Sequence, residues 1–227
     1  PEEFEQAQRS ESRGGEPVSK LDVSLTVRQV VRLPSFYLLV TGFSLLFVVL
    51  PGLTLHMIPY FTDRGLSDGV AVTVVSVYAA GGGLGSLIYG LVAERYSIRL
   101  TLATGLLLMA AGFVPLLAVH SPVPAILWGA YHGLIGGGMF TLQQIVFADY
   151  YGRESLGAIR GIVWPVQMGA NATGPIIAAV AFDVTGSYTL IFSVFGILVM
   201  IASLCVFLAR PPVGLAHPTP KDVRATP

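Results

Sequence analysis

The sequence is short of charge and of cysteine. Charged residues make up 11% of the 227-residue chain, against about 25% in an average soluble domain. Apolar residues make up 53%, so a soluble fold could not cover its surface with polar groups. The thirteen basic and thirteen acidic residues cancel, which argues against a nucleic-acid partner. The single cysteine, Cys205, excludes an internal disulfide and a cysteine-based zinc site. Among the broad classes of protein, this composition fits an integral membrane protein.

Long stretches of the sequence carry no Asp, Glu, Lys or Arg at all. These stretches are 33–62, 69–93, 100–148, 161–182 and 184–209, and each exceeds the roughly 18–20 residues that cross a bilayer as a helix. The stretch 100–148 is too long for one helix, and its segment 120–124, His-Ser-Pro-Val-Pro, is typical of a turn. The sequence therefore predicts an all-α integral membrane fold with transmembrane helices at six ranges: 35–61, 70–93, 100–119, 123–148, 158–182 and 187–209.

The basic residues predict how these helices are oriented. With the N-terminus in the cytoplasm, twelve of the thirteen Lys and Arg residues lie in inner segments and only Arg64 lies in an outer turn. This distribution follows the positive-inside rule and supports an even number of spans. We therefore expect a multi-pass protein of the plasma (inner) membrane, with the lipid bilayer as its solvent and both termini of this chain cytoplasmic.

The ends of the chain have a different composition. Residues 1–23 are polar and predict a flexible cytoplasmic segment. Residues 24–34 interleave apolar side chains with Arg28 and Arg32, which indicates an interfacial helix. Residues 210–227 are rich in proline and predict a disordered cytoplasmic tail. Because the chain begins with Pro1, we expect it to be a fragment of a longer protein.

Glycines cluster within two of the predicted spans. The second span carries five glycines, and the fourth carries Gly129, Gly133 and Gly137 at four-residue spacing, which predicts close helix packing. A shift of 89 residues places Gly85 on Gly174. The spans at 70–93 and 158–182 run in opposite directions, so this weak match fits an inverted repeat of three plus three helices, a pattern found in transporters.

The loop after the second span carries a motif. It reads Gly90-Leu-Val-Ala-Glu94-Arg95-Tyr-Ser-Ile-Arg99 and resembles the major facilitator superfamily signature Gly-x-x-x-Asp-Arg-x-x-x-Arg/Lys. Apart from the resemblance, a carboxylate beside two arginines at a helix end can form contacts that break between conformations. We therefore predict a conformational-gate loop made by Gly90, Glu94, Arg95 and Arg99. The alternative is that the arginines only fix topology.

Three further passages resemble segments of that superfamily, and they occur in the same order along the chain. They are 56–65, 148–161 and 174–188. The first resembles the end of the seventh helix in monocarboxylate-porter-like and oxalate/formate-antiporter-like members. The resemblance implies that the chain is the C-terminal six-helix half of a twelve-helix fold. It also implies secondary active transport of a small solute by alternating access, together with a missing N-terminal six-helix half. A small organic acid and a coupling proton are candidate partners.

Few polar side chains lie at membrane depth, where they are costly unless functional. Two stripes of them follow the fourth and fifth spans, and Tyr78 lies mid-way along the second. We expect the first, second, fourth and fifth spans to line a water-filled path, with the third and sixth facing lipid. The predicted substrate-cavity residues are Tyr78, His132, Gln143, Trp164, Gln167 and Asn171.

Simpler interpretations of these residues stay open. Gln167 and Asn171 are equally suited to bonding a neighbouring helix, and His132 to being a neutral buried histidine. Tyr78 and Trp164 are also typical packing residues. The alternative function is a non-transporting six-helix membrane scaffold or assembly protein. An enzyme is not expected, since no Gly-x-Ser-x-Gly, His-Glu-x-x-His or P-loop sequence occurs. We likewise expect no cofactor, no metal and no catalytic residue.

Overall fold

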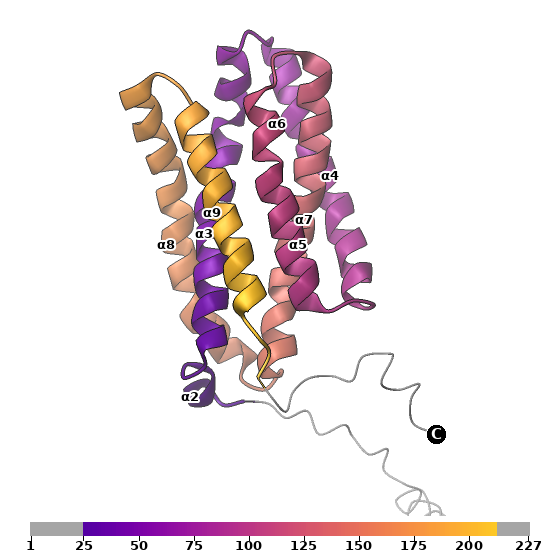
Figure 1. The fold of residues 1–227 in the computed structure, drawn as a ribbon, viewed down its shortest axis with the longest axis vertical. Helices are drawn as coiled ribbons and strands as arrows, with labels where there is room; N and C mark the ends of the chain where they lie inside the picture. The colour runs from indigo at the N-terminus through magenta and orange to yellow at the C-terminus, as the bar shows by residue number, and fades with distance from the viewer. Residues whose placement is uncertain (1–24, 213–227) are drawn as a thin grey trace, which may run out of the picture.

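The computed structural model describes residues 25–212, so the predicted flexible segment 1–23 and all but the first three residues of the predicted tail 210–227 lie outside that range. The described chain is helical, and its longest helices run side by side as a bundle (Figure 1). Leu25 N–H donates to the Tyr151 carbonyl at 3.0 Å and ties the start of this part to the basic end of the bundle. The helices are α2 (Val27–Val30), α3 (Pro34–Asp63), α4 (Asp68–Ala93), α5 (Ile98–Ala111), α6 (Phe113–Leu117), α7 (Pro122–Tyr151), α8 (Leu156–Thr185) and α9 (Thr189–Leu208).

The long helices cover the six predicted ranges, with one interruption. The range 100–119 is divided between α5 and α6 at Gly112. Pro115 has no backbone N–H, so one hydrogen bond to a carbonyl of the preceding turn is missing at this point. Side chains of neighbouring helices supply donors nearby, because Trp128 Nε1 donates to the Gly112 carbonyl at 2.8 Å and the Tyr60 hydroxyl to the Leu116 carbonyl at 2.6 Å.

Four segments of the described chain are long and apolar enough to cross a membrane by length and composition. They are Pro34–Asp63, Asp68–Ala93, Ile98–Leu117 and Thr189–Leu208. Helices α7 and α8 have 30 residues each, as many as α3, but they carry the polar stripes and are not among these four segments. Four such segments indicate a multi-pass membrane protein.

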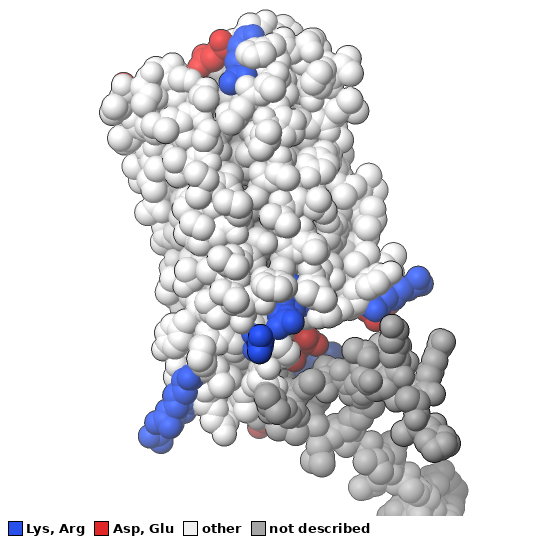
Figure 2. All heavy atoms as spheres, viewed as in Figure 1, with Lys and Arg blue, Asp and Glu red and all other residues white. Residues whose placement is uncertain are grey.

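Charges gather at the two ends of the bundle. On the face drawn in Figure 2, the middle of the molecule carries no acidic or basic side chain. One end holds Arg64 and three aspartates, namely Asp63, Asp68 and Asp183. The other end, which we call the basic end, holds seven arginines of the described part: Arg28, Arg32, Arg95, Arg99, Arg153, Arg160 and Arg210. A bilayer core would fit the uncharged band between them.

The helices pack as pairs. Helix α4 lies mainly on α7, α8 lies mainly on α3, and α5 lies on α9. Helices α3 and α9 form the middle of the bundle, while α4 and α8 lie at opposite flanks (Figure 1). The core consists of buried aliphatic and aromatic side chains on α3, α5, α7 and α9.

Candidate functional site

Close approach of two backbones positions the first candidate residues. Cβ atoms on three glycines of α7 would overlap backbone carbonyl oxygens of α4. The pairs are Gly129 with Val74, Gly133 with Tyr78, and Gly137 with Gly82. Gly85 of α4 likewise leaves no room for a side chain beside the backbone of Leu134. The glycine spacing seen in the sequence thus brings α4 and α7 into contact and places Tyr78 beside His132.

His132 lies inside a group of aromatic rings. Its ring stacks on Trp128 with centroids 4.9 Å apart and on Tyr78 at 6.1 Å, and it meets the edge of Phe113 at 5.2 Å. The side chain is fully buried, and neither nitrogen makes a well-formed hydrogen bond within residues 25–212. The Met109 carbonyl lies close to the ring. His132 is therefore enclosed by packing in this conformation.

Gln143 and Gln167 form the second candidate group. Gln143 Nε2 donates to Gln167 Oε1 at 3.0 Å, and both side chains are buried. The remaining atoms, Gln143 Oε1 and Gln167 Nε2, have no partner in the described part of the chain. Helices α7 and α8 make little other contact, so this amide pair is a principal link between them. A small pocket opens beside the pair, and its lining also includes Phe147, Arg160 and Trp164.

Trp164 and Asn171 lie on α8 with more open surroundings. Trp164 is 47% exposed and meets the ring of Phe47 edge-on at 6.4 Å. Asn171 is half-buried, one turn beyond Gln167 on the same helix. The structure thus brings Gln143, Trp164 and Gln167 together around one pocket. His132 and Tyr78 form a separate group between α4 and α7.

The predicted gate loop connects α4 and α5 at the basic end of the bundle. Glu94 is the C-cap of α4 and is exposed, as is Arg95. Neither side chain makes a hydrogen bond or ion pair with any residue in 25–212. Arg99 points to another helix instead, with its guanidinium carbon 5.9 Å from the ring centroid of Phe207. Gly90 has open space where a Cβ would lie.

Two polar contacts between helices were not predicted from the sequence. Arg160 donates to the Gln144 carbonyl at 2.8 Å and joins α8 to α7 beside the amide pair. Ser86 donates to the Gly137 carbonyl at 3.1 Å and joins α4 to α7. Arg160 lies seven residues before Gln167, which places both on one face of a helix. That spacing could have predicted that Arg160 lies on the same side of α8 as the amide pair.

Residues 25–212 include no group of three or more His, Cys, Asp or Glu side chains that could hold a metal ion. The candidate site therefore consists of neutral amides and aromatic rings, with arginine at its basic end. Such groups can hold a small solute by hydrogen bonds and by contact with ring faces.

The described part of the chain is thus a bundle of paired apolar helices with a small polar pocket between α7 and α8, as suits a multi-pass membrane protein. The family model described as Major Facilitator Superfamily matches residues 36–227. The match covers most of the chain, and the chain belongs to the Major Facilitator Superfamily. The resemblance inferred from the loop motif is confirmed.

Several curated relatives carry transporter names. Monocarboxylate transporter 12-B of Danio rerio is 26% identical over 179 residues, which cover 76% of this chain and 36% of that protein. Monocarboxylate transporter 12 of Xenopus laevis is 23% identical, covering 78% of this chain and 39% of the relative. Monocarboxylate transporter 2 of Rattus norvegicus is also 23% identical, with 77% and 37% covered. The chain spans less than two-fifths of the length of these relatives.

Proposed function

We propose that this chain is the C-terminal six-helix half of a secondary active transporter that moves a small solute by alternating access. The observation that carries the proposal is the Gln143–Gln167 pair, a buried polar link at a pocket between two helices that otherwise make little contact. Buried amides with unused hydrogen-bonding atoms are costly in an apolar bundle. The pocket beside them, of about 20 Å³, is the size of one water, so a solute would reach these atoms only in a conformation in which α7 and α8 separate.

The pairing of helices supports an inverted repeat of three plus three helices. Exchange of α3 with α7, α4 with α8, and α5 with α9 converts the α4–α7 contact into the α8–α3 contact. Gly85 and Gly174, matched by the shift of 89 residues, both lie against backbone in these two contacts: Gly85 at Leu134 and Gly174 at Val48. Matching close approaches at matching positions are expected from such a repeat.

The flanking helices support a missing N-terminal half. Helices α4 and α8 each have one main neighbour, and apolar side chains along both are exposed. A second six-helix half would cover these flanks and close a path lined by Tyr78, Gln143, Trp164, Gln167 and Asn171. His132 would join that lining only in a conformation in which α4 and α7 separate.

A small organic acid is the proposed class of solute, in keeping with the names of the relatives. Every Lys and Arg of the described helices lies near an end of the bundle, so a carboxylate held at mid-depth would take its cationic partner from outside this chain. Every Asp and Glu of the described helices also lies near an end of the bundle. A carboxylate that carries a proton at mid-depth would therefore also lie outside this chain. His132 is the titratable group at mid-depth that could carry a coupling proton within this chain.

The gate loop completes the proposed cycle. Glu94 and Arg95 have no partner within residues 25–212 and lie at the inner surface in the proposed orientation. We place their partners in the absent half, where contacts that form in one conformation and break in the other would alternate access.

Solute uptake by the intact transporter tests this proposal. We expect Gln167→Ala and Asn171→Ala to lower the rate of uptake of small monocarboxylates by tenfold or more at unchanged expression. Ser193→Ala is the matched control, because that exposed hydroxyl bonds only to its own helix at Thr189. Unchanged uptake kinetics in both the Gln167→Ala and Asn171→Ala variants would contradict the proposed cavity. The absence of any solute uptake by the intact protein would favour the alternative of a non-transporting scaffold.

A further inference from the structure

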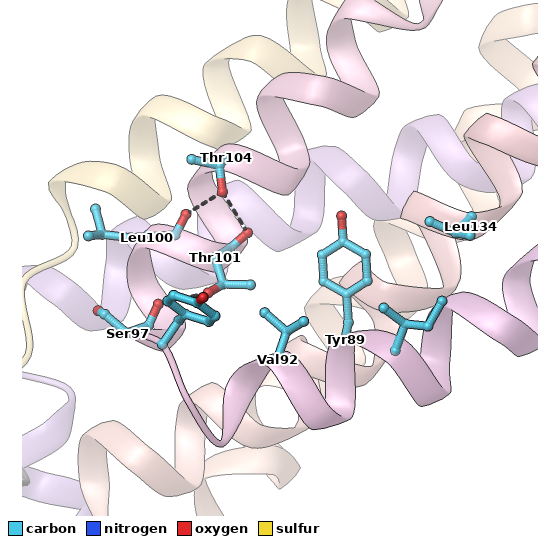
Figure 3. Close-up of a pocket in the computed structure, with 9 residues that line it drawn as sticks. Tyr89, Val92, Ser97, Leu100, Thr101, Thr104 and Leu134 are labelled. Carbon is cyan, nitrogen blue, oxygen red and sulfur yellow. Dashed lines mark hydrogen bonds between the residues drawn. The ribbon is translucent and has the colours of Figure 1, made fainter. Parts of the chain in front are cut away.

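An unassigned groove lies between α4 and α5 near the basic end of the bundle. Its volume is about 510 Å³, within the range of roughly 300–1,000 Å³ typical of small-molecule sites. Ile88, Tyr89 and Val92 of α4 form one wall, Leu100 and Thr104 of α5 form the other, and Leu134 of α7 is also in the lining (Figure 3).

Glycine contacts elsewhere explain why the groove exists. Gly85 and Gly137 bring α4 onto α7, and in consequence α4 scarcely touches α5. The ring of Tyr89 occupies the space beside Gly138, where a Cβ atom would overlap it. The groove between α4 and α5 therefore follows from the close packing of α4 on α7.

The walls are apolar, but hydroxyl groups line the end that lies toward the α4–α5 loop. Ser97 and Tyr96 belong to that loop, and their hydroxyls make no hydrogen bond within residues 25–212. Thr101 and Thr104 are already satisfied, because they donate to carbonyls of their own helix at 2.7–3.2 Å (Figure 3). The groove therefore combines a hydrocarbon-like interior with free polar groups at one mouth.

A positive charge lies next to that mouth along the chain. Arg95 directly precedes Tyr96, which lines the groove, and Arg95 is exposed with no partner among the described residues. Glu94 opposes it and Arg99 adds a second positive charge near α9, so the loop carries a net charge of plus one. Ile88, Leu100 and Tyr96 are 45%, 46% and 68% exposed, which opens the groove sideways toward surrounding lipid.

We propose that the groove binds one acyl chain of an anionic glycerophospholipid, with the lipid phosphate held by Arg95 and the hydroxyls of Tyr96 and Ser97. An apolar groove that opens laterally suits a hydrocarbon chain, and a guanidinium with free donors suits a phosphate. The groove shares no lining residue with the Gln143–Gln167 pocket, although Arg95 also belongs to the proposed gate loop.

Photo-crosslinking of the full-length protein in nanodiscs tests the site. The probes are phosphatidylglycerol and phosphatidylcholine with the same photoactivatable acyl chain. We expect phosphatidylglycerol to crosslink to α4 and α5 around Val92 and Thr104 in preference to phosphatidylcholine. Filling the groove by Val92→Trp should reduce that crosslink at least fivefold, while Val114→Trp, on an exposed side chain of α6, should leave it unchanged.

The headgroup contact has its own pair of variants. Arg95→Gln should lower the preference for the anionic lipid about fivefold, the value expected for one basic residue at a membrane surface. Arg28→Gln, an exposed arginine at the same end of the bundle, should not. Equal crosslinking of the two lipids, or a Val92→Trp variant that crosslinks like the parent, would overturn the proposal. So would a groove covered by another segment of the protein, seen as no crosslink to α4 or α5. Solute uptake measured on Val92→Trp, a residue outside both the proposed gate loop and the predicted cavity, keeps this result distinct from the transport proposal.

Discussion

At the scale of single residues, the Gln143–Gln167 hydrogen bond is the most specific feature of the candidate site. Each glutamine has one bonded and one unbonded polar atom. Replacing one glutamine by an apolar residue strands the other, whereas replacing both removes the polar cost altogether. The two side chains should therefore act as a coupled pair.

A double-mutant cycle checks this coupling. We expect Gln143→Leu and Gln167→Leu each to destabilise the protein by about 1–3 kcal/mol. The double variant should lose less than the sum of the two, with a coupling energy of roughly 0.5–3 kcal/mol. Thermal unfolding in a fixed detergent measures all four proteins. Strict additivity would show that the two amides do not interact.

The two tryptophans make a second residue-scale comparison. Trp128 is buried and donates to the Gly112 carbonyl, where α5 breaks into α6. Trp164 is half-exposed, and its indole N–H makes no hydrogen bond in the described part. Trp128→Phe should therefore lower the free energy of unfolding by about 1–3 kcal/mol, and Trp164→Phe should change it far less. Equal losses would contradict the role assigned to the Gly112 contact.

At the scale of helices, the close contact of α4 and α7 organises half of the bundle. Gly137 lies against the Gly82 backbone, so even a methyl group there would separate the helices. Gly83, on α4, has open space around it. Both glycines lie within helices, but Gly137 contacts the backbone of a neighbouring helix and Gly83 contacts no neighbouring atom at the Cβ position.

Alanine substitution at these two positions gives opposite expectations. Gly137→Ala should destabilise the protein, because the added Cβ overlaps backbone that cannot rotate away. Gly83→Ala should be neutral or stabilising by up to about 1 kcal/mol, the helix-propensity difference. Detergent unfolding curves measure both effects. A neutral Gly137→Ala would refute the packing of α4 on α7.

The sequence predicted the helices far better than their partners. Gaps between charges marked where the long helices lie, four of which are apolar enough to cross a membrane, since a bilayer excludes charge from any helix that crosses it. The break at Gly112 was not predicted, because Pro115 alone does not say whether neighbours will supply donors. The pairing of Gln143 with Gln167 was not predicted either, since helical stripes place residues on faces but do not say which faces meet. His132 lay on a predicted cavity stripe, and the rings that enclose it come from three different helices.

At the scale of the whole molecule, a band without charge separates a strongly basic end from an end with one arginine. This asymmetry predicts an orientation with the α4–α5 and α7–α8 loops in the cytoplasm. The same arrangement leaves α4 and α8 at the flanks, where a second six-helix half would pack. Family membership, helix pairing and charge distribution therefore support one account of the chain.

Labelling of single cysteines in intact cells tests this account most directly. In a Cys205→Ser background of the full-length protein, cysteines at Arg95 and Glu154 report on the basic end, and cysteines at Gly65 and Ser121 report on the other. A membrane-impermeant maleimide added outside should label positions 65 and 121 and should reach 95 and 154 only after the cells are permeabilised. Labelling of position 95 or 154 from outside, or of all four positions equally, would contradict the proposed arrangement of six helices across the membrane.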